Sequence, residues 1–356
     1  MIVSLRLQNY RSYQDESFEF EPGVNIVVGP NASGKTNLLE AILIITRGSS
    51  YRGSDQDVIT KGSDWARLDG VYLDNQQNAH PRTAKIRQDH TGIEKQFELD
   101  DKPFKRLGPE RMLPVVVFEP NHLQLITTSP EQRRNLLDNI LELTELRFGA
   151  LKRNYLRALA QRNAFLKQHP NTSLAEIFPW NVRLSDLGGH IATGRQTLIE
   201  TFNETLSETY SSIAKQPHKV RLEYVSKVTS GNYASGLLKL YEKHHQLDCL
   251  RGFTGDGPHR DDARIFIDGT PIQEAASRGE TRTLLLSLKV REAEMMESAR
   301  GIKPLLLLDD VFGELDGARR HALTEFLTKY QTFITTTDAD IVSSVFARSS
   351  KIIALN

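Results

Sequence analysis

The fold of this 356-residue chain is decided by the stretch Val24-Asn-Ile-Val-Val-Gly-Pro-Asn-Ala-Ser-Gly-Lys-Thr36. Its apolar beginning predicts a β-strand, and the remainder fits the pattern G-x-x-x-x-G-K-[ST] and opens a helix that runs to about residue 46. In such a loop the glycines let backbone N–H groups turn toward phosphate oxygens, and the start of the helix adds a partial positive charge. The stretch therefore predicts a phosphate-binding loop between a strand and a helix.

The loop residues are predicted to bind ATP. Lys35 is expected to reach the β- and γ-phosphates and to act in catalysis, and Thr36 to coordinate Mg²⁺. The rest of the loop is expected to cradle the phosphates and consists of Gly29, Pro30, Asn31, Ala32, Ser33 and Gly34. The alternative is an ordinary glycine turn. It is disfavoured, because chance would supply the pattern in only roughly one chain in a hundred of this size.

Composition indicates a soluble globular protein, with 39% hydrophobic and 25% charged residues. The 45 basic and 45 acidic residues balance, so any nucleic-acid surface must be local. The single cysteine, Cys249, excludes an intrachain disulfide and is interpreted as inert. The longest apolar run, residues 304–308, is far shorter than the roughly 18 residues of a membrane span. A cytoplasmic protein is expected.

The order of the patterns predicts two domains. Residues 1–119 alternate short period-two segments with one helix, which indicates a β-rich lobe. After the apolar run 115–118 the period becomes helical to about residue 215, with a helix start at Ser129-Pro130 and breaks at His169-Pro170 and Phe178-Pro179. The expectation is a discontinuous α/β head, residues 1–120 and 251–356, and a mainly helical arm, residues 121–250.

The C-terminal third returns to strand and helix patterns in alternation. Strands are predicted at 220–225 and at 263–272 around an Asp268-Gly269 hairpin turn, and a helix is predicted at about 281–298. A strand at 305–308, a helix near 318–330 and a strand at 332–336 follow. The buried strand 305–308 ends in Asp309 and Asp310, which suits a metal-holding and a water-orienting carboxylate beside a phosphate-binding loop. We assign Asp309 to Mg²⁺ and Asp310 to the attacking water, against the alternative of an acidic turn.

Lys35 and Asp309 lie 274 residues apart, from residue 35 to residue 309, so a domain is inserted between two halves of one site. With Ser277-Arg278-Gly279 opening a helix shortly before that strand, the arrangement resembles the ABC-type ATPases of the SMC class. The resemblance implies an α/β, ABC-type P-loop ATPase head with a mixed β-sheet lobe and a helical arm. It also implies that Ser277, Arg278 and Gly279 cap the nucleotide of a partner subunit.

More narrowly, the chain resembles the RecF family of bacterial recombination mediators along nearly its whole length. The matching stretches are Asn9-Tyr-Arg-Ser-Tyr13, the loop continuing into Asn37-Leu-Leu-Glu-Ala41, Phe118-Glu-Pro120, Pro130-Glu-Gln-Arg-Arg134, Gly257-Pro-His-Arg-Asp-Asp262, Ser277-Arg-Gly279, residues 305–316 and Ile334-Thr-Thr-Thr-Asp338. The resemblance implies that Arg11 and Asn37 contact the nucleotide, that Gly313-Glu-Leu-Asp316 is a D-loop at the dimer interface, and that Thr337-Asp338 replaces a switch histidine.

Alternatives and departures accompany that resemblance. Arg11 could be a solvated edge residue, and His259-Arg260 could simply cap the turn before Ala263. The family signature usually reads S-x-G-Q, but residue 280 is Glu, which suggests weaker or slower ATP-driven closure. No glutamine is placed for a Q-loop, because the chain continues after Phe118 as Glu119-Pro120-Asn121; Gln124 is a less favoured occupant of that position than Asn121.

Six basic residues and no acidic one lie between residues 146 and 170. On a helical wheel, Leu151, Tyr155, Leu159, Phe165 and Leu166 share one face, and the opposite arc carries Lys152, Arg153, Arg157 and Lys167. These four are the candidate DNA-binding residues, because cations along one exposed face supply salt-sensitive phosphate binding. A solvated helix face is the alternative. The insertion allows two arms of about 60 residues, or roughly 90 Å at 1.5 Å per residue, which favours a small clamp over a long tether.

The resemblance implies an ATP-dependent homodimer that binds double-stranded, gapped or junction DNA. It further implies weak DNA-dependent ATP hydrolysis with Mg²⁺, partnership with RecR and RecO in loading RecA, and a role in recombinational repair and replication recovery. Two alternatives stay open, the ATPase subunit of a transporter and a nucleotide-bound scaffold without turnover. The transporter is disfavoured because such a cassette has its signature much nearer the loop.

Overall fold

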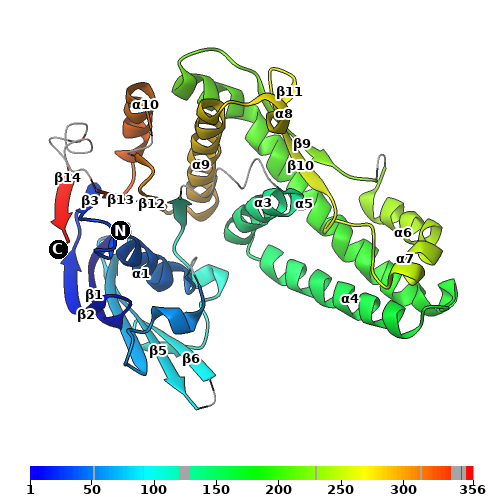
Figure 1. Ribbon diagram of the computed structural model, residues 1–356, viewed down its shortest axis with the longest axis horizontal. Helices are drawn as coiled ribbons and strands as arrows, with labels where there is room; N and C mark the ends of the chain where they lie inside the picture. Colours follow the sequence, from blue (N-terminus) through cyan, green and yellow to red (C-terminus); the bar gives the residue numbers. More distant parts are fainter. Residues whose placement is uncertain are drawn as a thin grey trace. The chain divides into compact units, whose positions relative to one another are not determined.

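The computed structural model describes residues 1–50, 53–90, 92–119, 129–228, 231–312, 315–337, 346 and 350–355. The chain divides into two compact units. Unit 1 comprises residues 1–122, 213–215 and 289–356, and unit 2 comprises residues 123–212 and 216–288. Each unit is built from elements that are far apart in the sequence (Figure 1).

A five-stranded parallel sheet forms the part of unit 1 that carries the phosphate-binding loop. Its order is β14 (Ser350–Ala354), β3 (Val24–Val28), β13 (Thr332–Thr336), β12 (Leu305–Asp309) and β8 (Val115–Phe118). β8, β12 and β13 are buried at every position, which is why they read as continuous apolar or Thr-rich runs. β12 lies between β13 and β8, and β13 pairs with β3. The sheet therefore aligns the ends of β3 and β12 at one edge.

A six-stranded antiparallel sheet forms the rest of the β-rich lobe. Its order is β2 (Tyr13–Glu19), β1 (Ile2–Tyr10), β4 (Trp65–Leu73), β5 (Ala79–Asp89), β6 (Gly92–Leu99) and β7 (Lys102–Phe104). These strands alternate buried and exposed residues, because only one face of the sheet is covered. Two short 3₁₀ turns, Asp55–Val58 and Pro109–Arg111, complete the lobe.

Helix α1 (Lys35–Arg47) packs against strands of both sheets and fills the core between them. It ends at Gly48, which has φ 83° and donates its N–H to Ile44. Gln331 joins the two sheets at another point. Its Oε1 accepts from Ile2 N at 2.8 Å, and its Nε2 donates to Ile2 O at 2.6 Å. Helix α10 (Gly317–Leu327) connects β12 to β13.

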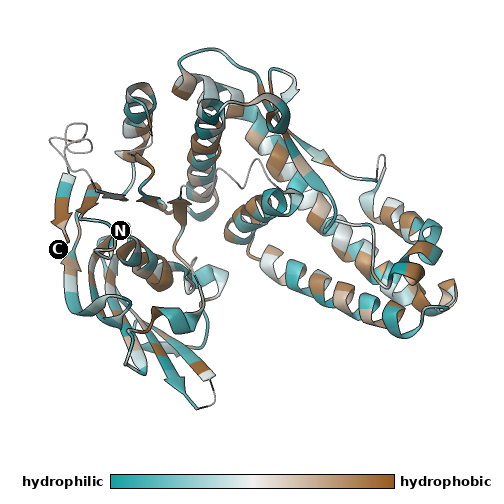
Figure 2. Ribbon diagram, in the orientation of Figure 1, coloured by the Kyte–Doolittle hydropathy of each residue, from teal (hydrophilic) through white to brown (hydrophobic). Residues whose placement is uncertain are grey.

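Unit 2 is built on three helices and a small sheet. The helices are α3 (Pro130–Thr144), α4 (Phe148–Gln168) and α5 (Leu174–Ala214); the sheet is β11 (Thr270–Pro271), β10 (Asp262–Ile267) and β9 (Val220–Val225). Shorter helices α6 (Tyr233–Lys243), α7 (His245–Arg251) and α8 (Ile272–Ala275) pack around them, and α9 (Arg278–Arg300) crosses the boundary into unit 1. Figure 2 shows hydrophobic and hydrophilic residues interleaved along α4, as expected of a helix with one buried face.

Several expectations about unit 2 are confirmed. Ser129 caps α3, and its side chain accepts from Gln132 N with Pro130 at the first helical position. Helix α4 ends at Gln168, directly before His169-Pro170. Asp268 and Gly269 have φ 50° and 83° in the turn between β10 and β11, as a tight hairpin requires.

The predicted break at Phe178-Pro179 is wrong, since α5 continues through Pro179. A proline inside a helix costs about 3 kcal/mol. Burial outweighs that cost, because aliphatic residues recur every seven positions at Ile177, Leu184, Ile191 and Leu198, all at most 3% exposed. Each such burial is worth about 1.5–3 kcal/mol.

The C-terminal domain boundary also differs from the expectation. The sequence placed residues 251–288 in the head, but they belong to unit 2. β10 pairs with β9 along six residues, and Arg133 of α3 binds Asp262 at 2.8 Å. The boundary near residue 120 falls beside the observed division at 122.

Candidate nucleotide site

The loop between β3 and α1 has the geometry of a phosphate cradle. Gly34 caps α1 with φ 100°, and a Cβ there would lie 2.9 Å from the hydroxyl oxygens of both Ser12 and Tyr13. Tyr13 also donates its hydroxyl to Gly34 O at 3.0 Å. The first turn of α1 contains no acidic residue, and no side chain caps it. The exposed N–H groups and the helix dipole at this end therefore suit an anion.

Lys35 is buried and folded back over the loop. Its Nζ donates to Gly29 O at 2.8 Å and to Pro30 O at 2.9 Å. Both acceptors are neutral carbonyls, so among the described residues no carboxylate competes with a phosphate for this ammonium. The hydroxyl of Ser33, inside the same loop, is buried and has no hydrogen-bond partner within the described residues. These features fit a triphosphate in the loop.

Thr36, Asp309 and Thr335 join three segments at the edge of the parallel sheet. Asp309 Oδ1 accepts from Thr36 Oγ1 at 2.9 Å and from Thr335 Oγ1 at 2.8 Å. The parallel pairing of β12 with β13 places Asp309 opposite Thr335. Thr36 and Asp309 are the two predicted Mg²⁺ residues, and the fold brings them together across 273 positions of sequence.

Asp310 directly follows this group. Its N–H donates to Thr335 Oγ1 at 2.9 Å, and its backbone has φ 52°. A left-handed backbone is uncommon for a residue other than glycine. It turns the chain at the end of β12, and the side chain of Asp310 is exposed. Two carboxylates in sequence thus occupy different environments, one buried and held by two threonines, the other at the surface.

Arg11 lies beside α1 and is not a solvated edge residue. Its Nε and Nη2 donate to the two carboxylate oxygens of Glu40 at 2.9 and 2.7 Å, and its Nη1 donates to Asp57 O at 2.7 Å. Asn37 donates its amide to Ser12 Oγ at 3.1 Å. Arg11 and Asn37 both line a hollow of about 590 Å³ along α1. Glu40 therefore fixes the arginine that was expected to contact phosphate.

The remaining predicted nucleotide residues are spread over both units. Ser277, Arg278 and Gly279 lie at the start of α9, in unit 2. Asp316 caps α10 in unit 1, where its side chain accepts from Arg319 N at 2.9 Å. The predicted Gly313 and Glu314 of the D-loop, Asp338, Pro120 and both Q-loop candidates, Asn121 and Gln124, lie outside the described residues.

The four predicted DNA-binding residues all lie on α4 but differ in surroundings. Arg153, Arg157 and Lys167 are exposed. Lys152 is half-buried, and its Nζ lies 3.2 Å from Asp138 and 3.1 Å from Glu142. A fifth cation of the same stretch, Arg162, is fully buried and donates to Asp248 at 2.8 Å. Only part of the basic stretch is therefore free to bind a ligand.

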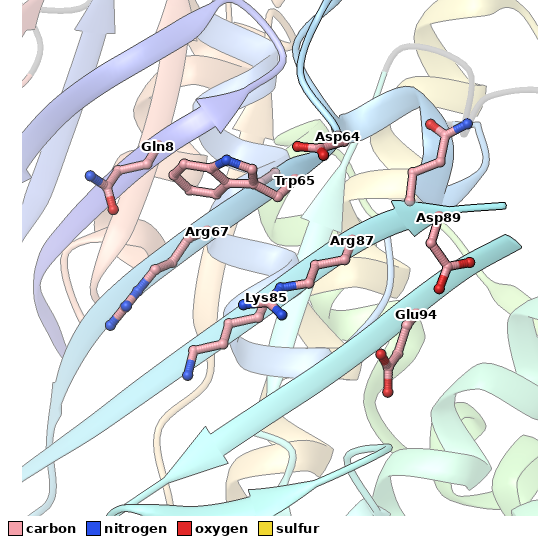
Figure 3. Close-up of a pocket in the computed structure, with 10 residues that line it drawn as sticks. Gln8, Asp64, Trp65, Arg67, Lys85, Arg87, Asp89 and Glu94 are labelled. Carbon is pink, nitrogen blue, oxygen red and sulfur yellow. The ribbon is translucent and has the colours of Figure 1, made fainter. Parts of the chain in front are cut away.

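A hollow of about 630 Å³ lies on the solvent face of the antiparallel sheet, and no residue of the loop lines it. Figure 3 shows Trp65, Arg67, Lys85 and Arg87 projecting from β4 and β5. Arg67 pairs with Asp69 at 2.7 Å, and Lys85 pairs with Glu98 at 2.5 Å. The carboxylates of Asp64, Asp89 and Glu94 also line it. Because charges of both signs alternate there, this face has no preference for an anion.

Three residues of the site were not assigned roles from the sequence: Tyr13, Glu40 and Thr335. Thr335 could have been noticed from the sequence, because the buried strand TFITT contains threonine hydroxyls at positions where aliphatic side chains are usual. Among the described residues no cluster of three or more His, Cys, Asp or Glu side chains could hold a metal ion by itself. Mg²⁺ at Thr36 and Asp309 would therefore need water and phosphate oxygens as further ligands.

None of the helices in the described parts of the chain is both long enough and apolar enough to cross a bilayer.

Comparisons with known proteins agree with this geometry. Residues 1–354 match the family described as RecF/RecN/SMC N terminal domain. The DNA replication and repair protein RecF of Limosilactobacillus fermentum is 33% identical, over 95% of this chain and 92% of that protein. RecF of Staphylococcus haemolyticus is 31% identical over 100% of this chain and 98% of that protein.

Solved structures give the same result. The recombination mediator RecF of the RecFOR pathway matches as RecF-ATPrS with a TM-score of 0.87 and as RecF-ATP with a TM-score of 0.85, both at 27% identity. They cover 96% and 95% of this chain, and the matches span 93% and 92% of those chains. An Smc head bound to the winged-helix domain of ScpA matches at 16% identity with a TM-score of 0.56, which supports the fold alone. The chain belongs to the RecF/RecN/SMC N-terminal domain family, and within it to the RecF proteins.

Proposed function

We propose that this chain is an ATP-dependent DNA-binding protein of recombinational repair and replication recovery, in which two copies close around two ATP molecules. The observation that carries the proposal is the group formed by Thr36, Asp309 and Thr335 beside the loop of Lys35. It unites the phosphate grip and the metal-holding carboxylate in one unit. The relatives of the RecFOR pathway support the same role.

The residues of the loop would divide the work of nucleotide binding. Lys35 would exchange its two carbonyl acceptors for phosphate oxygens, and Thr36 with Asp309 would hold Mg²⁺, Asp309 through water. Bound ATP and Mg²⁺ supply the phosphoanhydride and the charge that neutralises it. Asp310, exposed at the end of β12, would orient the attacking water. Since an aspartate is shorter than the glutamate usual in this class, slow hydrolysis that reopens the clamp is expected.

Each composite site would pair the loop of one copy with Ser277, Arg278 and Gly279 of the other, with Asp316 near the interface. ATP shared between copies stabilises only the dimer, so nucleotide binding and association should be linked. Light scattering with and without ATP and Mg²⁺ tests this link, and a doubling of mass with nucleotide is expected. An unchanged mass would reject the composite site. Association that needs ATP without any turnover would instead favour a nucleotide-bound scaffold.

The DNA-bound dimer would assist RecA loading together with RecO and RecR in the cytoplasm. The exposed cations of α4, Arg153, Arg157 and Lys167, would contact double-stranded, gapped or junction DNA. The test is RecA assembly on gapped DNA with RecO and RecR, in the presence and absence of this chain and ATP. Equal assembly in all mixtures would remove the mediator role and leave nucleotide binding intact.

A further inference from the structure

Two motifs that the nucleotide site does not use meet in unit 2. Residues 130–134 begin α3, and residues 257–262 comprise the turn before β10 and the first residue of that strand. Arg133 Nε and Nη2 bind the two carboxylate oxygens of Asp262, each at 2.8 Å, and Arg134 Nη1 donates to Asp261 O at 2.7 Å. The turn is thereby fixed against α3, which places Arg134 and Arg260 on one wall.

This wall belongs to a hollow of about 390 Å³ between α3, α4, α5 and the turn. Its cationic lining residues are Arg134, Lys152, Arg195 and Arg260, and its acidic ones are Glu131 and Asp138. Asp138 is already neutralised, because Arg195 binds it at 2.8 and 3.1 Å and Lys152 lies 3.2 Å away. The buried part of the hollow thus contains no carboxylate without a cation.

Arg134 and Arg260 differ from the other cations of the hollow. Neither forms an ion pair with any described residue; Arg134 donates to a carbonyl, and Arg260 lies over the ring of Phe253 at 5.4 Å. Glu131 is exposed at the rim and screened by solvent. Burial, followed by the charge of Arg195, lowers the pKa of Arg134. A half-buried guanidinium without a counter-ion is a ready contact for an oxyanion.

The nearby His259 is affected by the positive charges of Arg134 and Arg260. Its Nε2 donates to Thr254 O at 3.1 Å, so its Nδ1 accepts from the Tyr155 hydroxyl at 2.7 Å. Burial first, and then the charges of Arg260 and Arg134, lower its pKa to about 4. The ring is neutral at physiological pH and forms an uncharged floor, while the positive charge stays on the two arginines.

We propose that this hollow binds a phosphate group and that Arg134 and Arg260 are its charged contacts. The nucleic-acid backbone is the source that we favour, and in this respect the inference rests on the proposed function. Leu156 lines the hollow and is 48% exposed. The exposed Arg153 and Arg157 lie three residues before and one residue after Leu156 on α4. A phosphate in the hollow would therefore continue the line of exposed cations on α4. The other source of the same chemistry is a free nucleotide or inorganic phosphate.

The first test measures binding of a labelled DNA duplex over a salt series with ATP and Mg²⁺. The double variant Arg134→Gln/Arg260→Gln should lower the slope of log affinity against log salt by about two, one for each lost phosphate contact. Arg260→Gln alone changes an exposed side chain, should fold like the parent, and should lower the slope by about one. The matched control is Arg183→Gln/Arg251→Gln, two exposed arginines of α5 and α7 outside the hollow. An equal loss in the control would overturn the assignment.

The second test follows thermal unfolding with inorganic phosphate at constant ionic strength. Phosphate should raise the unfolding midpoint of the parent more than that of the double variant. The loop near Lys35 is the same in both proteins and contributes equally, so a difference in midpoint reports the hollow. Greater stabilisation of the parent than of the double variant, together with an unchanged DNA slope, assigns the hollow to a free oxyanion. An unchanged slope and equal stabilisation reject the site. A parent that binds no DNA would refute the proposed function, and the phosphate measurement would still decide the hollow.

Discussion

The phosphate loop of unit 1 and helix α4 of unit 2 both present cations in the sequence, but the fold uses them differently. In the loop, Lys35 is held by carbonyls of its own segment, six and five residues away. On α4, Arg162 is held by Asp248, 86 residues away, and Lys152 by Asp138 and Glu142 of α3. A contiguous loop sets its own geometry, whereas the role of a helix cation depends on which segment packs against it.

Removal of the loop cation should give the largest effect. Lys35→Ala is expected to cost about 2–5 kcal/mol of ATP binding, which is more than about 30-fold in affinity, because a buried charged contact is lost. Association with ATP should disappear with it. Nucleotide titration and light scattering measure the two effects. Lys102→Ala, an exposed lysine of β7, is the control and should leave both unchanged.

The buried cation of α4 should matter for stability. Arg162→Leu leaves Asp248 buried without its charged partner and should lower the free energy of unfolding by about 3–5 kcal/mol. Asn181 and Thr254 also lose a donor, from Arg162 at 2.9 and 2.8 Å. Denaturant unfolding measures the change, and Arg157→Gln on the exposed side should stay within about 0.5 kcal/mol of the parent. Similar losses in both variants would show that the burial of Arg162 is not decisive.

The exposed cations of α4 should control salt dependence instead. Arg153→Gln/Arg157→Gln/Lys167→Gln is expected to lower the log–log salt slope of DNA binding by about three. Lys152→Gln should leave the slope unchanged, because two carboxylates already neutralise that ammonium. Anisotropy of labelled DNA over a salt series measures both. A slope change with Lys152→Gln would mean that its ion pairs open when DNA binds.

Elements with a strong local pattern were predictable from the sequence almost to the residue. α1, β8, β12 and β13 were found because buried parallel strands read as unbroken runs and the loop fixes the start of its helix. The pairing of Thr36 with Asp309 followed from the two motifs together. These predictions needed only short-range patterns and the general rule that parallel strands end at one edge.

What the sequence did not predict depends on long-range packing. The continuation of α5 through Pro179 is stabilised by burial along the whole helix. The assignment of residues 251–288 to unit 2 depends on the pairing of β10 with β9. The inward position of Arg162 was missed because a wheel shows which residues share a face and not which face meets a carboxylate.

Glu280 offers the finest distinction between a local role and a partner-dependent one. Its carboxylate accepts from Ser277 N at 2.7 Å, and its own N–H donates to Ser277 Oγ at 3.2 Å, so the two residues form a capping box at the start of α9. Hydrogen bonds from the backbone N–H and the side chain of Ser277 to the carboxylate lower the pKa of Glu280. The unusual acid of the signature turn thus has a structural role in the monomer, and a glutamine can form the same reciprocal pair.

The two roles can be separated with Glu280→Gln. Loss of the acid from the first turn should cost only a few tenths of a kcal/mol of stability, because the side chain is only partly buried and a glutamine keeps the same hydrogen bonds. Since the folded pKa is lowered, the stabilisation by the carboxylate is present above the ordinary glutamate pKa and is lost as the pH falls through the lowered value. The stability difference between parent and variant should therefore vanish in acid.

In the proposed dimer the same change removes a negative charge facing the partner's phosphates, so ATP-dependent association should tighten by several-fold. Unfolding at two pH values and light scattering with ATP measure the two effects. Unchanged association with altered stability would limit Glu280 to its cap.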